Sequence, residues 1–218
     1  MLIEAAVESV DAAVAAAEGG AHRIELCLEL SSGGTTPDVQ LLRDCHSRVP
    51  LPIFVLVRPR PGNFLYSDDE HRTMRGQIQL LKQAGARGIV TGALTFTQQV
   101  HEAQTVALIE AAWPLPVTFH RAFDDCIDLS GALEILIKLE VERVLTSGGA
   151  RTAADGAAQI AKLVTQARER IEILAGGGIN ETNVARLVAE TGVREVHFSV
   201  TNAEKVRAVM RALEHGED

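Results

Sequence analysis

The chain has 218 residues, of which 46% are hydrophobic and 23% charged, and its formal net charge at pH 7 is -8. A chain of this length and composition can bury a sizeable core, which excludes an intrinsically disordered protein. An acidic surface repels phosphate backbones and anionic lipid headgroups, so we expect no nucleic-acid partner and no membrane partner. The N-terminal segment has no basic stretch and no apolar run is long enough to span a membrane, which predicts a cytoplasmic protein.

Short apolar runs alternate along the chain with segments of helical period. The predicted strands cover residues 2–7, 22–28, 52–58, 88–94, 116–123, 143–148, 171–176 and 195–200. The predicted helices cover residues 9–19, 38–48, 69–84, 99–112, 129–140, 152–169, 181–191 and 203–214. This alternation predicts an α/β fold with a parallel sheet and helices outside it. Eight such repeats predict a single (β/α)8 barrel of the TIM type over residues 1–218.

An open doubly wound sheet is the alternative architecture. Such a sheet commonly carries a GxGxxG fingerprint after its first strand, where the backbone must approach a dinucleotide closely. Here the chain reads AAVESVDAA at that place, so the barrel is favoured.

Polar residues interrupt the aliphatic pattern of several predicted strands. Side chains alternate between the faces of a strand, and the outer face of a barrel packs on helices and must be apolar. The residues predicted to point into the barrel or its upper rim are Glu4, Glu25, Cys27, Arg58, His120, His197 and Ser199. Because a buried charge needs a partner, we expect Glu4 and Glu25 to pair with Arg58, Arg121 or a protonated histidine. A polar plug with a purely structural role is the alternative interpretation.

Glycines follow two of the predicted strands. The seventh strand leads into Gly176 and Gly177, and the sixth leads into Ser147 and Gly148. Glycines let backbone N–H groups approach an anion, and barrels often bind phosphate in the loops after strands seven and eight. We therefore predict weak anion binding near Gly177, although tight turns also favour glycine.

The residues of the predicted interior indicate acid–base chemistry. Every lysine lies in a predicted helix, and no HExxH or GxSxG motif occurs, which argues against Schiff-base, zinc-hydrolase and serine-hydrolase chemistry. His120 could titrate near neutral pH, with Glu25 as its partner or as a separate base, while Arg58 or Arg121 holds an anionic substrate. The candidate catalytic residues are Glu25, Arg58 and His120, for an isomerase, epimerase or lyase. The candidate ligand-binding residues are Glu4, Arg60, Arg121, Asp124, Ser147, Gly148, Gly176, Gly177, His197 and Ser199.

Seven segments, in order along nearly the whole chain, resemble the CutC family, called copper homeostasis proteins. They are GAHRIELC (20–27), GGTTP (33–37), VRPRPGNFLYSDDE (57–70), GIVTGAL (88–94), VTFHRAFDDC (117–126), RVLTSGG (143–149) and EVHFS (195–199). The resemblance implies a TIM-barrel-like fold and a cytoplasmic location, and it is compatible with a homodimer. The chain departs from the family in lacking a long segment after the eighth strand, which puts any function that needs a lid in doubt.

The family name implies copper, and Cu(I) prefers thiolate and thioether ligands. Cys27 and Cys126 lie in the matching segments and are the candidate metal ligands, whereas Cys45 lies in a predicted helix. Cys27 ends the second strand and Cys126 follows the fifth, so barrel dimensions put their backbones roughly 10–15 Å apart. We therefore expect no tight two-cysteine site in one subunit, and leave open a weaker site on Cys27 or one shared between subunits. Two functions follow: a copper(I)-binding or copper-homeostasis protein, and an enzyme for a small anionic metabolite, phosphorylated or not.

Overall fold

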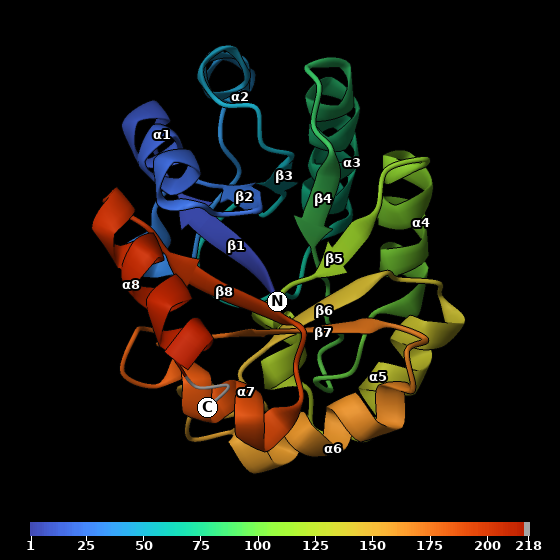
Figure 1. Cartoon of the computed structure of the whole chain (residues 1–218). Helices are drawn as coiled ribbons and strands as arrows, with labels where there is room; N and C mark the ends of the chain where they lie inside the picture. Colours follow the sequence, from blue (N-terminus) through green and yellow to red (C-terminus); the bar gives the residue numbers. More distant parts are fainter. Residues whose placement is uncertain (216–218) are drawn as a thin grey trace.

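Eight parallel strands close into a barrel in the computed structural model, which describes residues 1–215 (Figure 1). Neighbours in the chain are neighbours in the sheet, and β1 pairs with β8 to complete the ring. The strands are β1 (Leu2–Val7), β2 (Arg23–Leu26), β3 (Ile53–Leu56), β4 (Gly88–Thr91), β5 (Val117–Phe119), β6 (Arg143–Thr146), β7 (Glu172–Gly176) and β8 (Glu195–Ser199). This closure confirms the predicted (β/α)8 barrel, and the open doubly wound alternative is wrong.

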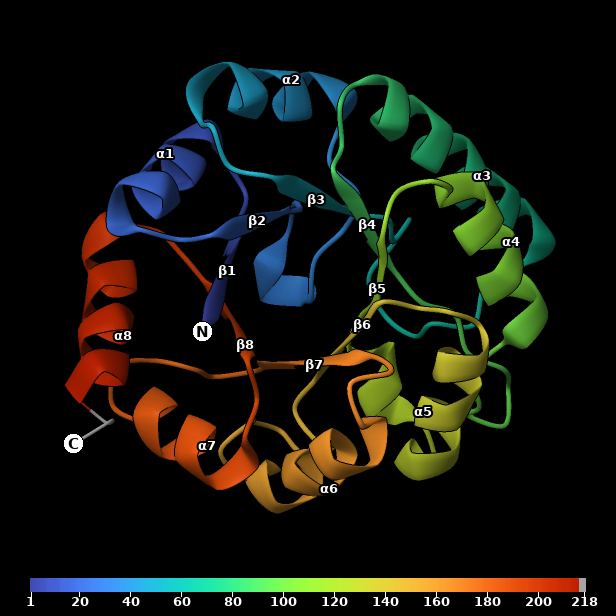
Figure 2. The same ribbon diagram turned by 45° about the vertical axis from the view of Figure 1, so that its right-hand side comes forward.

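One helix follows each strand, and the helices form a ring outside the barrel (Figure 2). They are α1 (Val10–Gly19), α2 (Val39–Arg48), α3 (Asp68–Gln83), α4 (Glu102–Ala112), α5 (Leu129–Lys138), α6 (Ala157–Ala167), α7 (Val184–Thr191) and α8 (Ala203–His215). Aliphatic residues of the strands, such as Ile24, Ile53 and Val117, are buried in the main core. The apolar face of each strand therefore packs on the helices, as the alternation predicts.

Some elements are shorter than the sequence predicts, because side chains cap the backbone locally. β5 ends before His120, whose imidazole accepts a hydrogen bond from the amide of Ala122 and begins a 3-10 turn, η2 (Arg121–Asp125). The helix α6 begins at residue 157 rather than 152, since Thr152 accepts a hydrogen bond from the amide of Asp155 in a preceding turn. Such side-chain bonds offer the backbone an alternative to a strand or helix.

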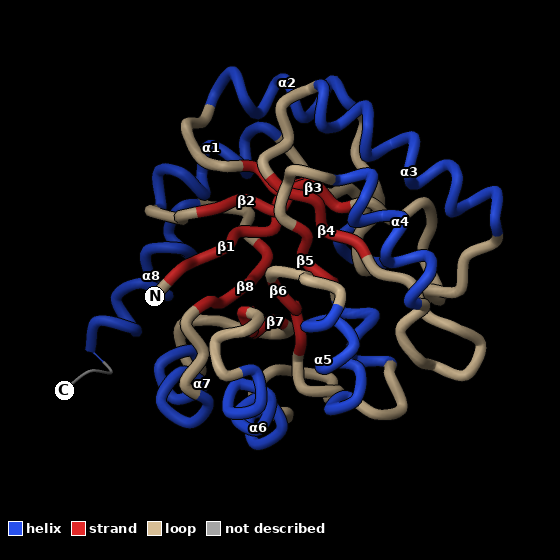
Figure 3. Tube along the Cα trace, turned by 90° about the vertical axis from the view of Figure 1, so that its right-hand side faces the viewer, coloured by secondary structure: helices blue, strands red, loops and turns tan. Residues whose placement is uncertain are grey.

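The loops that follow the strands wall one end of the barrel. The longest cover residues 27–38 and 57–67, and the first contains a second 3-10 turn, η1 (Leu30–Ser32). Figure 3 shows the loops in tan between the red strands and the blue helices. Only residues 200–202 separate β8 from α8, so the predicted absence of a long segment there is confirmed. Among the helices described, none has the length and apolar character needed to cross a membrane. The carboxyl ends of the strands thus carry the loops that can shape a site.

Candidate functional site

A cavity of about 520 Å³ opens at the carboxyl ends of the strands. Its polar lining comes from several strand ends and loops: Glu25, Arg58, His120, Arg121, Asp124, Asp125, His197, Ser199 and Lys205. A second hollow, of about 630 Å³, lies on the outside of the barrel at α5 and α6, beside the ion pair of Glu134 and Arg170. Both of those side chains are more than two-fifths exposed, so the outer hollow offers no buried reactive group, and the barrel mouth is the candidate site.

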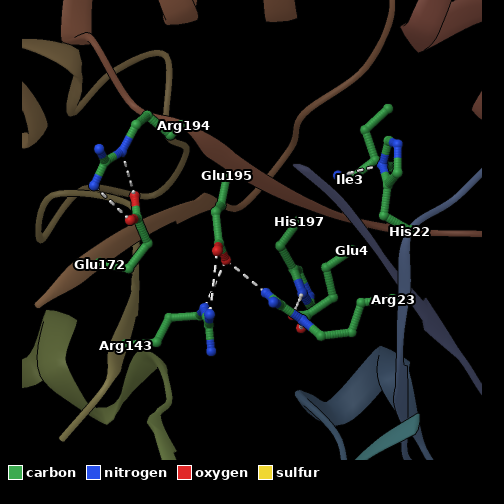
Figure 4. Close-up of polar contacts among 9 residues, drawn as sticks. All are labelled: Ile3, Glu4, His22, Arg23, Arg143, Glu172, Arg194, Glu195 and His197. Carbon is green, nitrogen blue, oxygen red and sulfur yellow. Dashed lines mark hydrogen bonds and ion pairs between the residues drawn. The ribbon is translucent and has the colours of Figure 1, made fainter. Parts of the chain in front are cut away.

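Glu4, Glu25 and His197 meet inside the barrel, with one ligand atom of each within 4.8 Å of the others. His197 Nδ1 lies 2.8 Å from Glu4 Oε1 (Figure 4). Burial opposes ionisation of Glu4, but the hydrogen bond from His197 and the charge of Arg23 lower its pKa to about 2. Burial opposes a charge on His197 too, yet the two glutamates raise its pKa above the usual value. The carboxyl groups of Glu4 and Glu25 therefore favour the positively charged form of His197.

Glu25 is buried without a bonding partner for Oε2. Its burial raises its pKa to about 7, although the positive charge of His197 acts in the opposite direction. Glu25 also lines the cavity, so its carboxyl group can meet a ligand. A carboxyl group that changes its protonation near neutral pH can both take and give a proton.

Three residues at the amino ends of their strands form an ion-pair network below this cluster, which we call the floor network: Arg23, Arg143 and Glu195. Arg23 donates to Glu195 at 2.6 Å and also bonds to Glu4, while Arg143 donates to both oxygens of Glu195 at 2.6 and 3.1 Å (Figure 4). The ring of Phe54 lies 4.8 Å from the guanidinium of Arg23 and 5.7 Å from that of Arg143. Sequence reasoning missed these residues, although the same alternation that places Glu25 and His197 inside also places Arg23 and Glu195 inside.

The partners expected for the two glutamates are corrected by this network. Glu4 pairs with Arg23 and His197, and neither Arg58 nor Arg121 forms an ion pair with Glu4 or Glu25 in the described chain. The histidine part of the expectation is therefore confirmed for Glu4. The arginine part is wrong because Arg58 and Arg121 follow the ends of β3 and β5, where nearer groups bind them.

Arg58 binds the loops around the cavity. Its guanidinium donates to the carbonyl oxygens of Gly34 and Gly62, both at 2.8 Å, and lies 4.9 Å from the centre of the Phe64 ring. These acceptors are uncharged, so no carboxylate neutralises the positive charge of Arg58 at the cavity wall. Arg60 is a different case, because it pairs with Glu70 outside the cavity lining.

The carboxylate of Asp124 occupies the loop after β6, which is one of the two glycine loops considered for anion binding from the sequence. Its carboxylate accepts hydrogen bonds from the amides of Ser147 and Gly149, both at 3.0 Å, and from Arg121 at 2.8 Å. The amide of Gly148 donates to the hydroxyl of the preceding threonine. An internal carboxylate thus takes the place of a ligand at this loop.

The loop after β7 is the better anion candidate. For the amides of Gly177 and Gly178, no hydrogen-bond partner occurs within residues 1–215. Gly177 has φ +103°, and a Cβ built there would lie 3.3 Å from Arg121 Nη1. Gly176 ends β7 against Leu145. The predicted anion near Gly177 therefore has two free amides and a neighbouring guanidinium available.

His120 is buried in the cavity wall and is neutral at pH 7 rather than titrating there. Its Nδ1 accepts the amide N–H of Ala122 at 3.2 Å, and its Nε2 has no partner among residues 1–215. The ring packs on Phe64, with 4.8 Å between the ring centres. Burial, together with the charge of Arg58, lowers the pKa of His120 to about 3.

The two candidate cysteine ligands lie in different clusters. Cys27 is buried inside the barrel with Phe54 and Leu56, whereas Cys126 belongs to the main core. Burial and nearby carboxylates raise the pKa of Cys27 far above the usual range and that of Cys126 to about 12. Within the described residues, the single group of three or more metal-binding side chains is Glu4, Glu25 and His197, which contains no cysteine.

Comparison with known proteins identifies the family. The CutC family model matches residues 1–202. The chain belongs to the CutC family. This CutC chain is 47% identical over 198 residues to the copper homeostasis protein cutC homolog of Homo sapiens, covering 91% of the chain and 72% of the relative. The homolog of Mus musculus is 46% identical over 202 residues, 93% of this chain and 74% of the relative.

A solved CutC structure has the same barrel. The crystal structure of CutC from Streptococcus agalactiae has a TM-score of 0.85 at 31% identity, covering 90% of this chain and 97% of that one. A phosphoribosylanthranilate isomerase from Thermotoga maritima has a TM-score of 0.65 at 10% identity, covering 99% of each chain. The second likeness extends to the fold alone.

Proposed function

We propose that this CutC chain serves copper homeostasis and that it does so through the polar barrel mouth rather than through a thiolate copper site. The names of the human and mouse relatives support the role, since each relative matches more than nine-tenths of this chain. The involvement of the barrel mouth is supported by Glu25. This residue has a buried carboxyl group in the wall of the cavity, and its Oε2 has no hydrogen-bond partner. An unpaired buried polar group costs stability, and such groups in clefts are typical of functional sites.

The thiols of the chain do not fit a tight Cu(I) site. A thiolate, not a thiol, is the metal ligand, and cationic neighbours are what lower a thiol pKa. Burial raises the pKa of both thiols, and the charged groups nearby raise it further: Glu25 and Glu8 at Cys27, and aspartates at Cys126. A weaker site on Cys27 alone, or one shared between two copies of the chain, stays a prediction.

The Glu4, Glu25 and His197 cluster has a different donor set. Carboxylate oxygen and imidazole suit a harder cation than Cu(I). Glu4 already bonds to Arg23 and His197, and these bonds compete with any metal ion for its oxygens. We therefore assign the cluster to proton handling rather than to copper.

A second candidate function is an isomerase, epimerase or lyase that acts on a small anionic metabolite. It is favoured by the meeting of Glu25 and His120 in one cavity with the guanidinium groups of Arg58 and Arg121. In this proposal the carboxyl group moves a proton while the cations hold the anionic end of the substrate. The homodimer, the cytoplasmic location and the single-domain organisation stay predictions of the sequence.

An anaerobic Cu(I) titration against a competing chelator tests the main proposal. It uses the native protein and the variants Cys27→Ser and Cys126→Ser. We expect the native protein to compete no better than either variant, because both thiols are protonated and lie in separate clusters. One tight equivalent of Cu(I) that both variants lose would overturn the barrel mouth as the working site and restore the cysteine pair.

A further inference from the structure

The hydrogen bond to His120 determines which ring nitrogen carries the proton. A backbone amide can only donate, so the Nδ1 atom that accepts from Ala122 at 3.2 Å must present a lone pair. A neutral imidazole then carries its hydrogen on Nε2. That Nε2 is buried and has no partner in the described part of the chain. His120 therefore holds an unused N–H donor in the wall of the cavity.

The surroundings hold the ring in this state. A Cβ at Gly92 would lie 2.8 Å from Nδ1, so only glycine leaves room for the ring at its present place. Phe64 packs on His120 and also lies 4.9 Å from the guanidinium of Arg58. A nearby positive charge and an apolar contact both disfavour a second proton on the imidazole.

An acceptor and an anion-binding group lie in the same cavity as this donor. Glu25 lines the cavity, and its buried Oε2 is bonded by no described group. Arg121 lines it too, beside the free amides of Gly177 and Gly178. The cavity of about 520 Å³ thus combines a neutral N–H donor, a carboxyl group and two free amides beside the ion pair of Arg121 and Asp124.

We propose that His120 is a constitutively neutral donor to the oxygen of a bound carbonyl compound, and that Glu25 takes the proton from the carbon beside that carbonyl. This inference rests on the ligand site proposed at the barrel mouth and names its substrate class. The substrate is a short carbonyl compound with an acidic C–H bond and an anionic group, such as a phosphate, which Arg121 and the loop after β7 bind.

The step balances without a cofactor. The ionised carboxylate of Glu25 forms an O–H bond as the C–H bond breaks, and the C–H electron pair becomes the C=C bond of an enolate. The carbonyl π pair moves to oxygen, where the Nε2–H of His120 stabilises the negative charge. Glu25 then returns the proton to carbon, which regenerates the compound or yields its isomer.

Nitrogen-15 NMR of imidazole-labelled protein tests the state of His120 directly. We expect the Nε2–H tautomer at every pH between about 5 and 9, with no titration of that ring. A hydrogen on Nδ1, or a titration in this interval, would overturn the donor role. Because this readout needs no ligand, it is independent of the proposed ligand site.

Binding of 2-phosphoglycolate, a planar carboxylate with a phosphate, tests the donor against an enolate-like ligand. We expect His120→Ala to weaken binding about tenfold or more, while His120→Gln, which keeps an N–H donor, stays within about threefold of the native protein. His101→Ala is the matched control, because His101 also accepts an amide hydrogen bond at Nδ1 but lies outside the cavity lining. Equal losses in both His120 variants would overturn the donor role yet leave the ligand site in place. No binding to the native protein would contradict the proposed ligand site itself.

Deuterium uptake from D₂O at the carbon beside the carbonyl of dihydroxyacetone phosphate tests the role of Glu25. We expect the native protein to exceed Glu25→Gln by about 100-fold or more, because the amide cannot accept the proton. Equal rates for the two proteins would overturn the base role. Retained binding of 2-phosphoglycolate in Glu25→Gln would show that the loss is in proton transfer rather than in the site.

Discussion

At the amino end of the barrel interior, the charges of Arg23, Arg143 and Glu195 are paired with one another, whereas at the carboxyl end Glu25 and His120 each keep a buried polar atom without a partner. Both ends are built from inward-pointing residues of the same strands. The difference lies in the charges. Each charged group of the floor network has an ion-pair partner, although Nη1 of Arg143 has no hydrogen-bond partner, whereas Glu25 lines a cavity and has no ion-pair partner in the described chain.

The contrast distinguishes buried polar groups that pair with one another from buried polar groups that can still bind a ligand. A buried ion pair whose partners are complete is a poor guide to activity, because it already satisfies its own charges. An unpaired carboxyl group carries a free-energy cost that a ligand can relieve. We therefore propose the purely structural role for the floor network and the ligand-binding role for the mouth.

The largest expected effect comes from breaking the floor network with Glu195→Gln. The substitution leaves the buried guanidinium of Arg143 without a carboxylate and that of Arg23 with Glu4 alone. We expect the free energy of unfolding to fall by about 3–5 kcal/mol in urea denaturation, as for other buried pairs that lose one partner.

The matched control for that substitution is Glu190→Ala, which breaks an exposed ion pair with Arg186. The side chain of Arg186 is 82% exposed and that of Glu190 is 45% exposed, so solvent already screens their attraction. The free energy of unfolding should stay close to that of the native protein. If both variants lost a similar amount of unfolding free energy, the floor network would not be more important for stability than an exposed ion pair.

At the mouth, Glu25→Gln should stabilise the protein in a pH-dependent way. Burial raises the pKa of Glu25 from 4.5 to about 7, so between these values the native state holds a proton that the unfolded state has lost. Native stability therefore falls as the pH rises through this window, and the penalty is complete above it.

Urea denaturation at about pH 5 and about pH 8 measures this effect. We expect Glu25→Gln to unfold with about 1–3 kcal/mol more free energy than the native protein at the higher pH, and with little difference at the lower pH. A gain of the same size at both values would mean that Glu25 is not held protonated by its surroundings.

The smallest expected effect concerns the anion subsite and uses two glycines of positive φ. Gly177→Ala and Gly62→Ala should each lower the free energy of unfolding by about 1 kcal/mol, because φ is +103° and +93° at these positions. Only at Gly177 would the new Cβ lie as close as 3.3 Å to the guanidinium of Arg121, since at Gly62 the nearest atom is 3.9 Å away.

Binding of 2-phosphoglycolate distinguishes the two glycine variants. Gly177→Ala should weaken it severalfold by displacing Arg121, whereas Gly62→Ala should bind as the native protein does. Unchanged binding in Gly177→Ala would remove the loop after β7 from the proposed site.

Hydrophobic periodicity was enough to predict the barrel and some of the strand residues that face its interior, although Arg23, Arg143 and Glu195 were missed. The alternation in β2 and β8 placed Glu25 and His197 inside, because a strand that packs on helices must turn its aliphatic side chains outward. The ends of elements were less predictable. His120 was read as the continuation of a strand, but its hydrogen bond with the amide of Ala122 begins a 3-10 turn instead.

The sequence by itself determined the fold class, the family and the membership of the barrel interior, since these depend on period and on local pattern. Only the tertiary structure decided which of those residues are paired. Glu4 bonds to Arg23 and His197, while Glu25 remains free. Pairing depends on distances between strands that are far apart in the chain, and no local pattern encodes those distances. The neutral state of His120 was decided in the same way, by burial and by the charge of Arg58.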